Sequence, residues 1–125
     1  MPELDPRPSV WVGHVVLPVP DVGKSREFFS RLGMRDLGDD GPVAILELRG
    51  GTHLILVPGD APQKDADATF DLMVDDLDTS HRRFSAQGLK PSQIEEGPFH
   101  RYFMLTAPSG HVVTVNSSHA SGEPV

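Results

Sequence analysis

Two histidines and one aspartate supply the residue types of a divalent metal site. His14, His53 and Asp71 each lie in a short segment rich in Val, Ile or Leu, which is typical of a β-strand. Two imidazoles and one carboxylate are ligands that Fe, Mn, Ni or Zn accept. His14 and Asp71 are also the types that acid–base chemistry without a metal requires. A structural histidine, and an ion pair of Asp71 with Arg49 or Arg101, are the alternatives.

The segments that carry these residues belong to a unit that occurs twice. Residues 14–34 and 69–89 align without a gap at a constant offset of 55 and share seven of twenty-one residues. Each copy has a strand, an aspartate (Asp21 or Asp76) at the N-cap position, an amphipathic helix and a glycine after it. In the second copy the strand is expected over 69–74. Each half continues with three further strands, which predicts an α+β fold of two tandem βαβββ modules.

The repeat and the turn residues also divide the chain. We predict an N-terminal arm at 1–9, a first module at 10–57, a linker at 58–68, a second module at 69–118 and a C-terminal tail at 119–125. Each half alone is too small to bury a large core, so the halves are expected to pack together as one domain. The second module has four extra residues around 96–100, and an insertion beside a cleft is a suitable place for specificity.

Composition excludes several classes of protein. The chain has 125 residues, a formal charge of −7 and no cysteine. Disulfides, thiolate nucleophiles and cysteine-based zinc sites are therefore excluded. The negative charge argues against nucleic acid and against an anionic membrane surface as partners. No basic segment followed by an apolar run opens the sequence, and no apolar stretch approaches 18 residues. We therefore expect a cytoplasmic protein.

Alternation along the strands separates an apolar face from a mixed face. The apolar residues, expected beneath the helices, are Val15, Leu17, Val19, Leu54, Leu56, Phe70, Leu72, Val74, Val113 and Val115. The mixed face comprises Val12, His14, Val16, His53, Ile55, Val57, Thr69, Asp71, Met73, Val112, Thr114 and Asn116. Polar groups among aliphatic ones are typical of a ligand cleft, although a half-solvated sheet or a dimer interface has the same composition. His100 and Tyr102, beside the insertion, are expected at the cleft mouth.

Two motifs carry a resemblance to a known family. The first strand has the pattern H-x-x-L-x-V-x-D over 14–21, and the last hairpin has P-S-G-x-x-x-x-V over 108–115. With the duplicated unit, these motifs resemble the vicinal oxygen chelate superfamily, which includes glyoxalase I, bleomycin-resistance proteins, fosfomycin-resistance enzymes and extradiol dioxygenases. The resemblance covers residues 10–118. It implies that the mixed sheets form an open, cleft-lining half-barrel, often across a homodimer.

The resemblance also bears on the metal. Carried over by position, the four metal-ligand sites of the family fall on His14, Ile55, Thr69 and Thr114. Only His14 is a usual ligand, and one imidazole does not hold a catalytic ion. His53 lies two residues along the strand from Ile55, and Asp71 lies two residues from Thr69. Each is therefore displaced from the family's ligand position by roughly 6.6–6.8 Å.

The resemblance therefore implies a protein that binds a small, partly apolar molecule without the usual metal. The first alternative is a lyase, isomerase or dioxygenase-type enzyme. It would use a divalent metal (Fe, Mn, Ni or Zn) at a degenerate site around His14, or metal-free acid–base chemistry of His14 and Asp71. The second alternative is a regulatory or interaction domain with a residual cleft.

Overall fold

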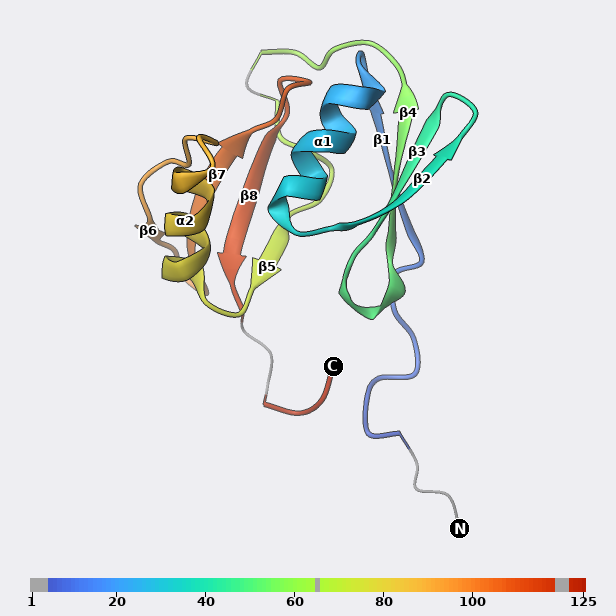
Figure 1. Ribbon diagram of the computed structural model, residues 1–125. Coiled ribbons are helices and arrows are strands. Elements are labelled where there is room, and N and C mark those ends of the chain that lie inside the picture. Colours follow the sequence, from blue (N-terminus) through green and yellow to red (C-terminus); the bar gives the residue numbers. More distant parts are fainter. Residues whose placement is uncertain (1–4, 65, 119–121) are drawn as a thin grey trace.

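A computed structural model describes residues 5–64, 66–118 and 122–125. Two βαβββ modules follow one another along the chain, and each has one four-stranded sheet and one helix (Figure 1). The α+β fold with two open mixed sheets is therefore confirmed. No helix in the described part of the chain is both long and apolar enough to cross a membrane.

The first module contains β1 (His14–Val19), α1 (Val22–Leu32), β2 (Arg35–Asp40), β3 (Val43–Glu47) and β4 (His53–Pro58). Its strand order is β1-β4-β3-β2, with β1 parallel to β4 and the other pairs antiparallel. A turn at Arg49–Gly51 joins β3 to β4. Gly50 and Gly51 have φ values of 85° and 96°, a region that favours glycine, so the glycine pair makes this tight connection possible.

The second module repeats this arrangement. It contains β5 (Leu72–Val74), α2 (Leu77–Ala86), β6 (Glu95–Glu96), β7 (Arg101–Thr106) and β8 (Val112–Ser117). Its strand order, β5-β8-β7-β6, is that of the first module, with β5 parallel to β8. The sequence repeat thus corresponds to a structural repeat.

Both helices begin at the predicted caps. The side chain of Asp21 accepts a hydrogen bond from the backbone N–H of Lys24, and that of Asp76 from Thr79, both at 3.0 Å. The two caps have nearly the same backbone conformation, with φ and ψ of −132° and 98° for Asp21 and −127° and 100° for Asp76. Each aspartate therefore satisfies one N–H that the first helical turn leaves without a partner.

The strand expected over 69–74 is shorter than predicted, since β5 begins at Leu72. Asp67 forms an isolated parallel bridge with Val112, and regular pairing resumes where Leu72 lies opposite Val115. Between these two pairs the chain advances by five residues from 67 to 72 but by only three from 112 to 115. The segment that leads into β5 therefore has two extra residues, which interrupt the pairing with β8. Thr69 and Asp71 lie in this interruption and have no regular partner on β8.

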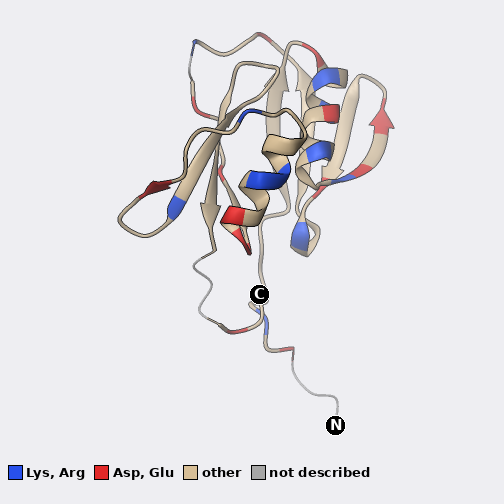
Figure 2. Ribbon diagram, turned by 60° about the vertical axis from the view of Figure 1, so that its left-hand side comes forward, with Lys and Arg blue, Asp and Glu red and all other residues tan. Residues whose placement is uncertain are grey.

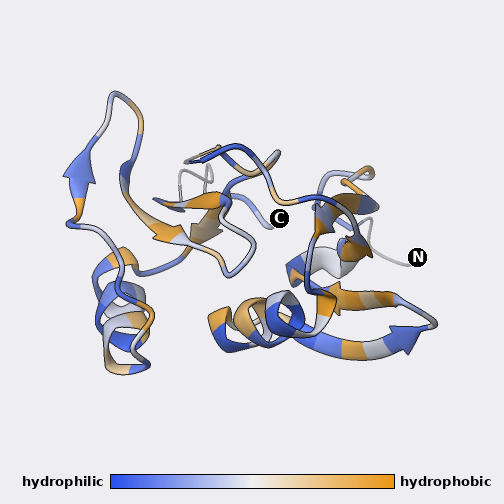
Figure 3. Ribbon diagram, turned by 90° about the horizontal axis from the view of Figure 1, so that it is seen from above, coloured by the Kyte–Doolittle hydropathy of each residue, from blue (hydrophilic) through white to orange (hydrophobic). Residues whose placement is uncertain are grey.

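The predicted apolar face is confirmed, because its residues form or border one core that both modules share. The buried part of this core consists of Leu17, Val19, Phe28, Phe29, Leu32, Ala44, Leu46, Leu54, Leu56, Leu77, Phe84, Phe103, Leu105, Ala107, Val113 and Val115. Phe29 of α1 reaches Phe70 of the second module, with 6.2 Å between ring centroids. Seen from above, the modules lie side by side with α1 between them (Figure 3).

Two arginines connect the ends of α1 and α2 across the contact between the two modules, which we call the module seam. Arg31 in the last turn of α1 donates to the backbone carbonyl of Gln87, the C-cap of α2. Arg83 in the last turn of α2 donates to the carbonyl of Leu32, the last residue of α1, at 2.9 Å. Figure 2 shows basic residues on both helices. Each helix C-terminus, where carbonyls lack helical partners, is thus bonded to a cation of the other module.

Candidate functional site

A row of polar side chains crosses the open face of the first sheet. His14 on β1 lies opposite His53 on β4, His53 lies opposite Glu47 on β3, and Glu47 lies opposite Arg35 on β2. The imidazole centroids of His14 and His53 are 5.8 Å apart. Glu47 lies 3.1 Å from His53 Nε2 through one oxygen and 2.9 Å from Arg35 Nη1 through the other. The row is therefore a connected chain of ring, ionic and hydrogen-bonding contacts.

An aliphatic row lies beside the polar one. Val16 on β1 faces Ile55 on β4, which faces Ile45 on β3. Val16 is 52% exposed, a large value for a valine in a sheet. The predicted mixed face is thus an apolar strip edged by the His14–Arg35 row, and a partly apolar ligand would find both kinds of contact there.

The second sheet has a matching row. Met73 on β5 faces Asn116 on β8, Asn116 faces Tyr102 on β7, and Tyr102 faces Glu95 on β6. The Tyr102 hydroxyl donates to Glu95 at 2.9 Å, and this hydrogen bond raises the pKa of Tyr102 above its usual value of 10.0. Met73 is 53% exposed whereas Asn116 is buried. An apolar edge followed by hydrogen-bonding groups therefore occurs on this sheet too.

Thr114 lies one pair further along the same face, opposite Met104. A hollow of about 430 Å³ adjoins this part of the sheet and is lined by Asp67, Lys90, Ser92, Met104, Thr106 and Val112. Of these residues the sequence had placed only Val112 on the mixed face, because the others come from β7, from the segment before β5 and from the segment between α2 and β6. Its volume lies within the ~300–1,000 Å³ of small-molecule sites.

Thr69 and Asp71 are not positioned as expected. Both are exposed and precede β5, so neither holds a regular place on the mixed face. The predicted ion pairs of Asp71 are wrong. Arg49 pairs instead with Asp75 at 2.8 Å, and Arg101 pairs with Asp78 at 3.0 Å. Asp75 directly follows β5 and Asp78 lies in the first turn of α2, so the acidic partners of both arginines come after β5 rather than before it.

The candidate metal ligands do not come together on this face. Among the described residues, no three His, Asp or Glu side chains are grouped so that they could hold one ion. His14 and His53 approach each other, but Asp71 does not join them. The described part of a single chain therefore does not supply the three ligands that a catalytic ion generally takes.

The insertion forms a firmly held hairpin at the end of the second sheet. His100 Nδ1 lies 2.9 Å from the carbonyl of Ser117, and the backbone N–H of Arg101 donates to the Ser117 hydroxyl at 3.1 Å. Gly97 donates to the carbonyl of His100 at 2.7 Å, and a Cβ at Gly97 would lie 2.8 Å from that oxygen. The tip presents Phe99 with 85% of its surface exposed. The hairpin thus fixes His100 and Tyr102 at one end of the sheet.

The two sheets remain separate within the chain. β1 and β5 are edge strands, and no strand pairing joins one sheet to the other among the residues described. The open faces of the two sheets therefore carry similar sets of groups without closing into one barrel among the residues described.

A duplicated βαβββ unit with open mixed sheets defines the fold of the vicinal oxygen chelate proteins. Residues 11–115 match the Glyoxalase/Bleomycin resistance protein/Dioxygenase superfamily, and the chain belongs to this superfamily. The resemblance stated from the sequence is therefore confirmed. The comparison with curated proteins found no significant match.

Solved structures share the fold over nearly the whole chain. TnmS3, an antibiotic binding protein from Streptomyces sp. CB03234, has a TM-score of 0.74 and 23% identity, covering 89% of this chain and 98% of its own. Lactoylglutathione lyase from Agrobacterium tumefaciens has a TM-score of 0.70 and 19% identity, with coverage of 93% and 99%. Oxidase ChaP-H2 has a TM-score of 0.68 and 21% identity, with coverage of 90% and 97%. At these identities the likeness establishes the fold alone.

Proposed function

We propose that the protein binds a small, partly apolar molecule on its open sheet faces and does so without a resident metal. The observation that carries this proposal is the pairing, on each sheet, of exposed aliphatic groups with a connected polar row. Val16 and Met73 supply the apolar contact, and the His53–Glu47 and Tyr102–Glu95 pairs supply oriented polar groups. Such a surface suits a ligand with an apolar body and a few hydrogen-bonding groups.

The proposal includes a cytoplasmic homodimer. A single open sheet face provides one wall of a site, whereas small-molecule sites generally bury most of their ligand. The edges of β1 and β5 are free of strand partners within the described chain. A second copy that places its second module against the first module of this chain would supply the opposite wall and cover Val16 and Met73. Symmetry would then create two equal sites.

Individual residues have distinct proposed roles. Ile55, Thr114 and Met73 would contact the body of the ligand, whereas His53, Asn116 and Tyr102 would orient its polar groups. His100 would close one end. His14, beside His53, is proposed as a polar anchor. Thr69 and Asp71 are proposed as contacts from the segment before β5.

A metal enzyme is the second candidate, and the approach of His14 to His53 is the observation that favours it. A partner copy would bring further side chains to this pair and complete a site for Fe, Mn, Ni or Zn. Lactoylglutathione lyase and oxidase ChaP-H2 share the fold, so the scaffold is compatible with lyase, isomerase or dioxygenase-type chemistry.

One pair of measurements separates the candidates. Untagged protein and the His14→Ala variant are analysed for metal content with and without added Ni, Zn, Mn and Fe(II). Absence of metal from both, together with a ligand-induced rise in Tm that Met73→Asp removes, supports the binding protein. Near-stoichiometric metal that disappears in His14→Ala would overturn it in favour of the enzyme. Light scattering on the same samples gives the oligomeric state, and a monomer that binds with full affinity would contradict the shared site.

A further inference from the structure

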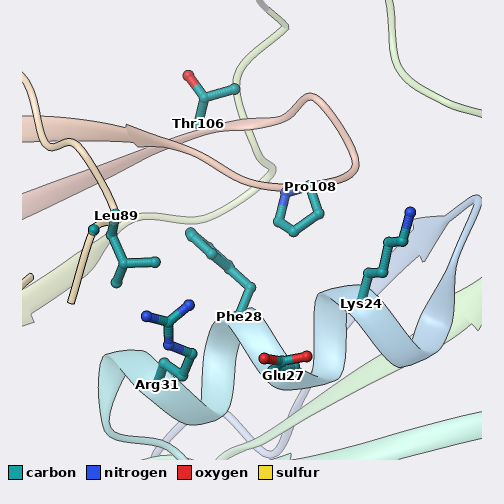
Figure 4. Close-up of a pocket in the computed structure, with 8 residues that line it drawn as sticks. Lys24, Glu27, Phe28, Arg31, Leu89, Thr106 and Pro108 are labelled. Atoms are coloured by element: carbon teal, nitrogen blue, oxygen red, sulfur yellow. The ribbon is translucent and has the colours of Figure 1, made fainter.

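A second hollow lies at the module seam and shares one lining residue, Thr106, with the hollow beside Met104. Its volume is about 340 Å³, within the range of small-molecule sites. We call it the seam hollow. It is lined by Lys24, Glu27, Phe28, Arg31, Gly88, Leu89, Thr106 and Pro108 (Figure 4). One wall is α1, and the other is formed by the segment after α2 and the β7–β8 turn. The hollow therefore exists only when the two modules are packed together.

The α1 wall is one continuous face of the helix. Residues 24, 27, 28 and 31 have the i, i+3, i+4, i+7 spacing that places side chains on the same side. Glu27 and Arg31 are four residues apart, a spacing at which oppositely charged side chains usually pair. Here Arg31 instead donates to the carbonyl of Gln87 across the seam. Among the described residues, neither Glu27 nor Arg31 forms an ion pair.

The seam hollow therefore contains two cations, Lys24 and Arg31, and one carboxylate, Glu27, and none of the three is in an ion pair among the described residues. Arg31 has five N–H donors in a planar fork, and the bond to Gln87 orients this fork while leaving other donors available. Glu27 offers two acceptor oxygens nearby. The distance between Cβ atoms at this spacing is roughly 5–6 Å. A ligand with a carboxylate and an ammonium on the same carbon atom matches this arrangement.

An apolar surface lies next to the charged pair. The Phe28 ring is directed from α1 toward the opposite wall, where Leu89 and Pro108 lie on either side of it (Figure 4). Phe28 is only 5% exposed, so its position is fixed by the core. An apolar side chain of a ligand would contact these three residues while its charged groups face Glu27 and Arg31.

We infer that the seam hollow binds a free α-amino acid with an apolar side chain. The carboxylate lies against Arg31, the ammonium against Glu27, and the side chain against Phe28, Leu89 and Pro108. Because the ligand contacts both modules, binding favours the packed arrangement and raises the Tm of the protein. None of the residues that line this site is among those proposed to contact the ligand on the open sheet faces.

The test uses three probes that differ by one charged group: L-phenylalanine, 3-phenylpropanoate, which lacks the ammonium, and 2-phenylethylamine, which lacks the carboxylate. Their Kd values are measured by calorimetry or NMR titration on the full chain and on the Glu27→Gln variant. Glu27 is exposed on α1, so this variant is expected to fold. Asp60→Asn, an exposed change of the same charge in the linker, is the matched control.

The expected results for the probes have opposite signs. Glu27→Gln weakens the binding of L-phenylalanine and 2-phenylethylamine about two- to fivefold, which is the effect of losing a partly solvated charge pair. It strengthens the binding of 3-phenylpropanoate by a similar factor. Asp60→Asn changes each of the three Kd values by less than about 1.5-fold, because only a screened, long-range charge effect remains. A general loss of structure would weaken all probes together.

Two results would overturn the inference. The first is no saturable binding of L-phenylalanine up to about 10 mM, which corresponds to an affinity too weak for a specific site. The second is equal effects of Glu27→Gln on L-phenylalanine and 3-phenylpropanoate, which would place binding elsewhere, such as on the open sheet faces.

Discussion

The arginine contacts across the module seam permit a quantitative test of how the modules are held together. Arg83 donates to the carbonyl of Leu32, and its guanidinium carbon lies 5.0 Å from the centroid of the Phe84 ring. Arg83→Met keeps the aliphatic packing over the ring and removes the charge and the hydrogen bond. A charged donor on a partly exposed carbonyl and an exposed cation–π contact together contribute about 1–2 kcal/mol.

This loss corresponds to a measurable change in Tm. At roughly 2.1 cal/mol/K per residue, unfolding entropy for a chain of this size is about 0.26 kcal/mol/K, so Arg83→Met should lower the Tm by about 4–8 °C. Scanning calorimetry and urea unfolding followed by circular dichroism are the assays. Arg82→Met is the control, because Arg82 contacts Thr79 within its own helix at 3.2 Å. It should cost less than about 0.5 kcal/mol.

An equal loss in the two variants would refute the reasoning, because the stability of the seam would then not depend on the contact with Leu32. A double-mutant cycle with Arg31→Met adds a second check. The two arginines bond to the C-terminal ends of two different helices but support one interface, so their effects should be non-additive by at least about 0.5 kcal/mol.

Three other residues or pairs give direct predictions. Burial lowers the pKa of His111 below 6.5. The unfolded chain therefore binds the proton more readily, and stability should fall as the pH drops through 6.5. Urea unfolding at pH 7.5 and 5.5 should show a smaller loss for His111→Gln than for the wild type, and equal losses would contradict this. Asp21→Ala and Asp76→Ala should each lower the free energy of unfolding by about 1 kcal/mol, since each removes an equivalent N-cap hydrogen bond. Losses that differ twofold between the two variants in urea unfolding would show that the caps are not equivalent. Gly97→Ala should destabilise the hairpin by about 1–3 kcal/mol, because its Cβ would meet the carbonyl of His100. Faster amide exchange at residues 97 and 99–101 would report this, and unchanged exchange would count against it.

The sequence was most informative where structure depends on near neighbours. Asp21 and Asp76 are caps because a carboxylate three residues before a free N–H is sufficient to bond it. The apolar face followed from alternation, because a residue's side of a strand depends on parity alone. Both predictions therefore hold in the structure without knowledge of how the modules pack.

The site was less predictable because its geometry depends on pairing between distant segments. Glu47 was missed although its parity in Val43–Glu47 places it on the mixed face, since its contact with His53 requires the register of β3 against β4. Asp71 was misplaced because two extra residues before β5 alter the pairing with β8. The seam hollow depends on the packing of α1 against the second module, for which the sequence contains no local signal.

The two extra residues before β5 also explain how this part of the site can vary. Side chains on a strand alternate with a period of two, so an excess of one residue would turn Leu72 and Val74 away from the core, whereas an excess of two preserves their side. We therefore expect insertions and deletions in this segment to be tolerated in pairs. The segment that carries Thr69 and Asp71 can then change in length or sequence while the residues beneath α2 keep their contacts, and we expect ligand preference at the proposed site to diverge without a loss of stability.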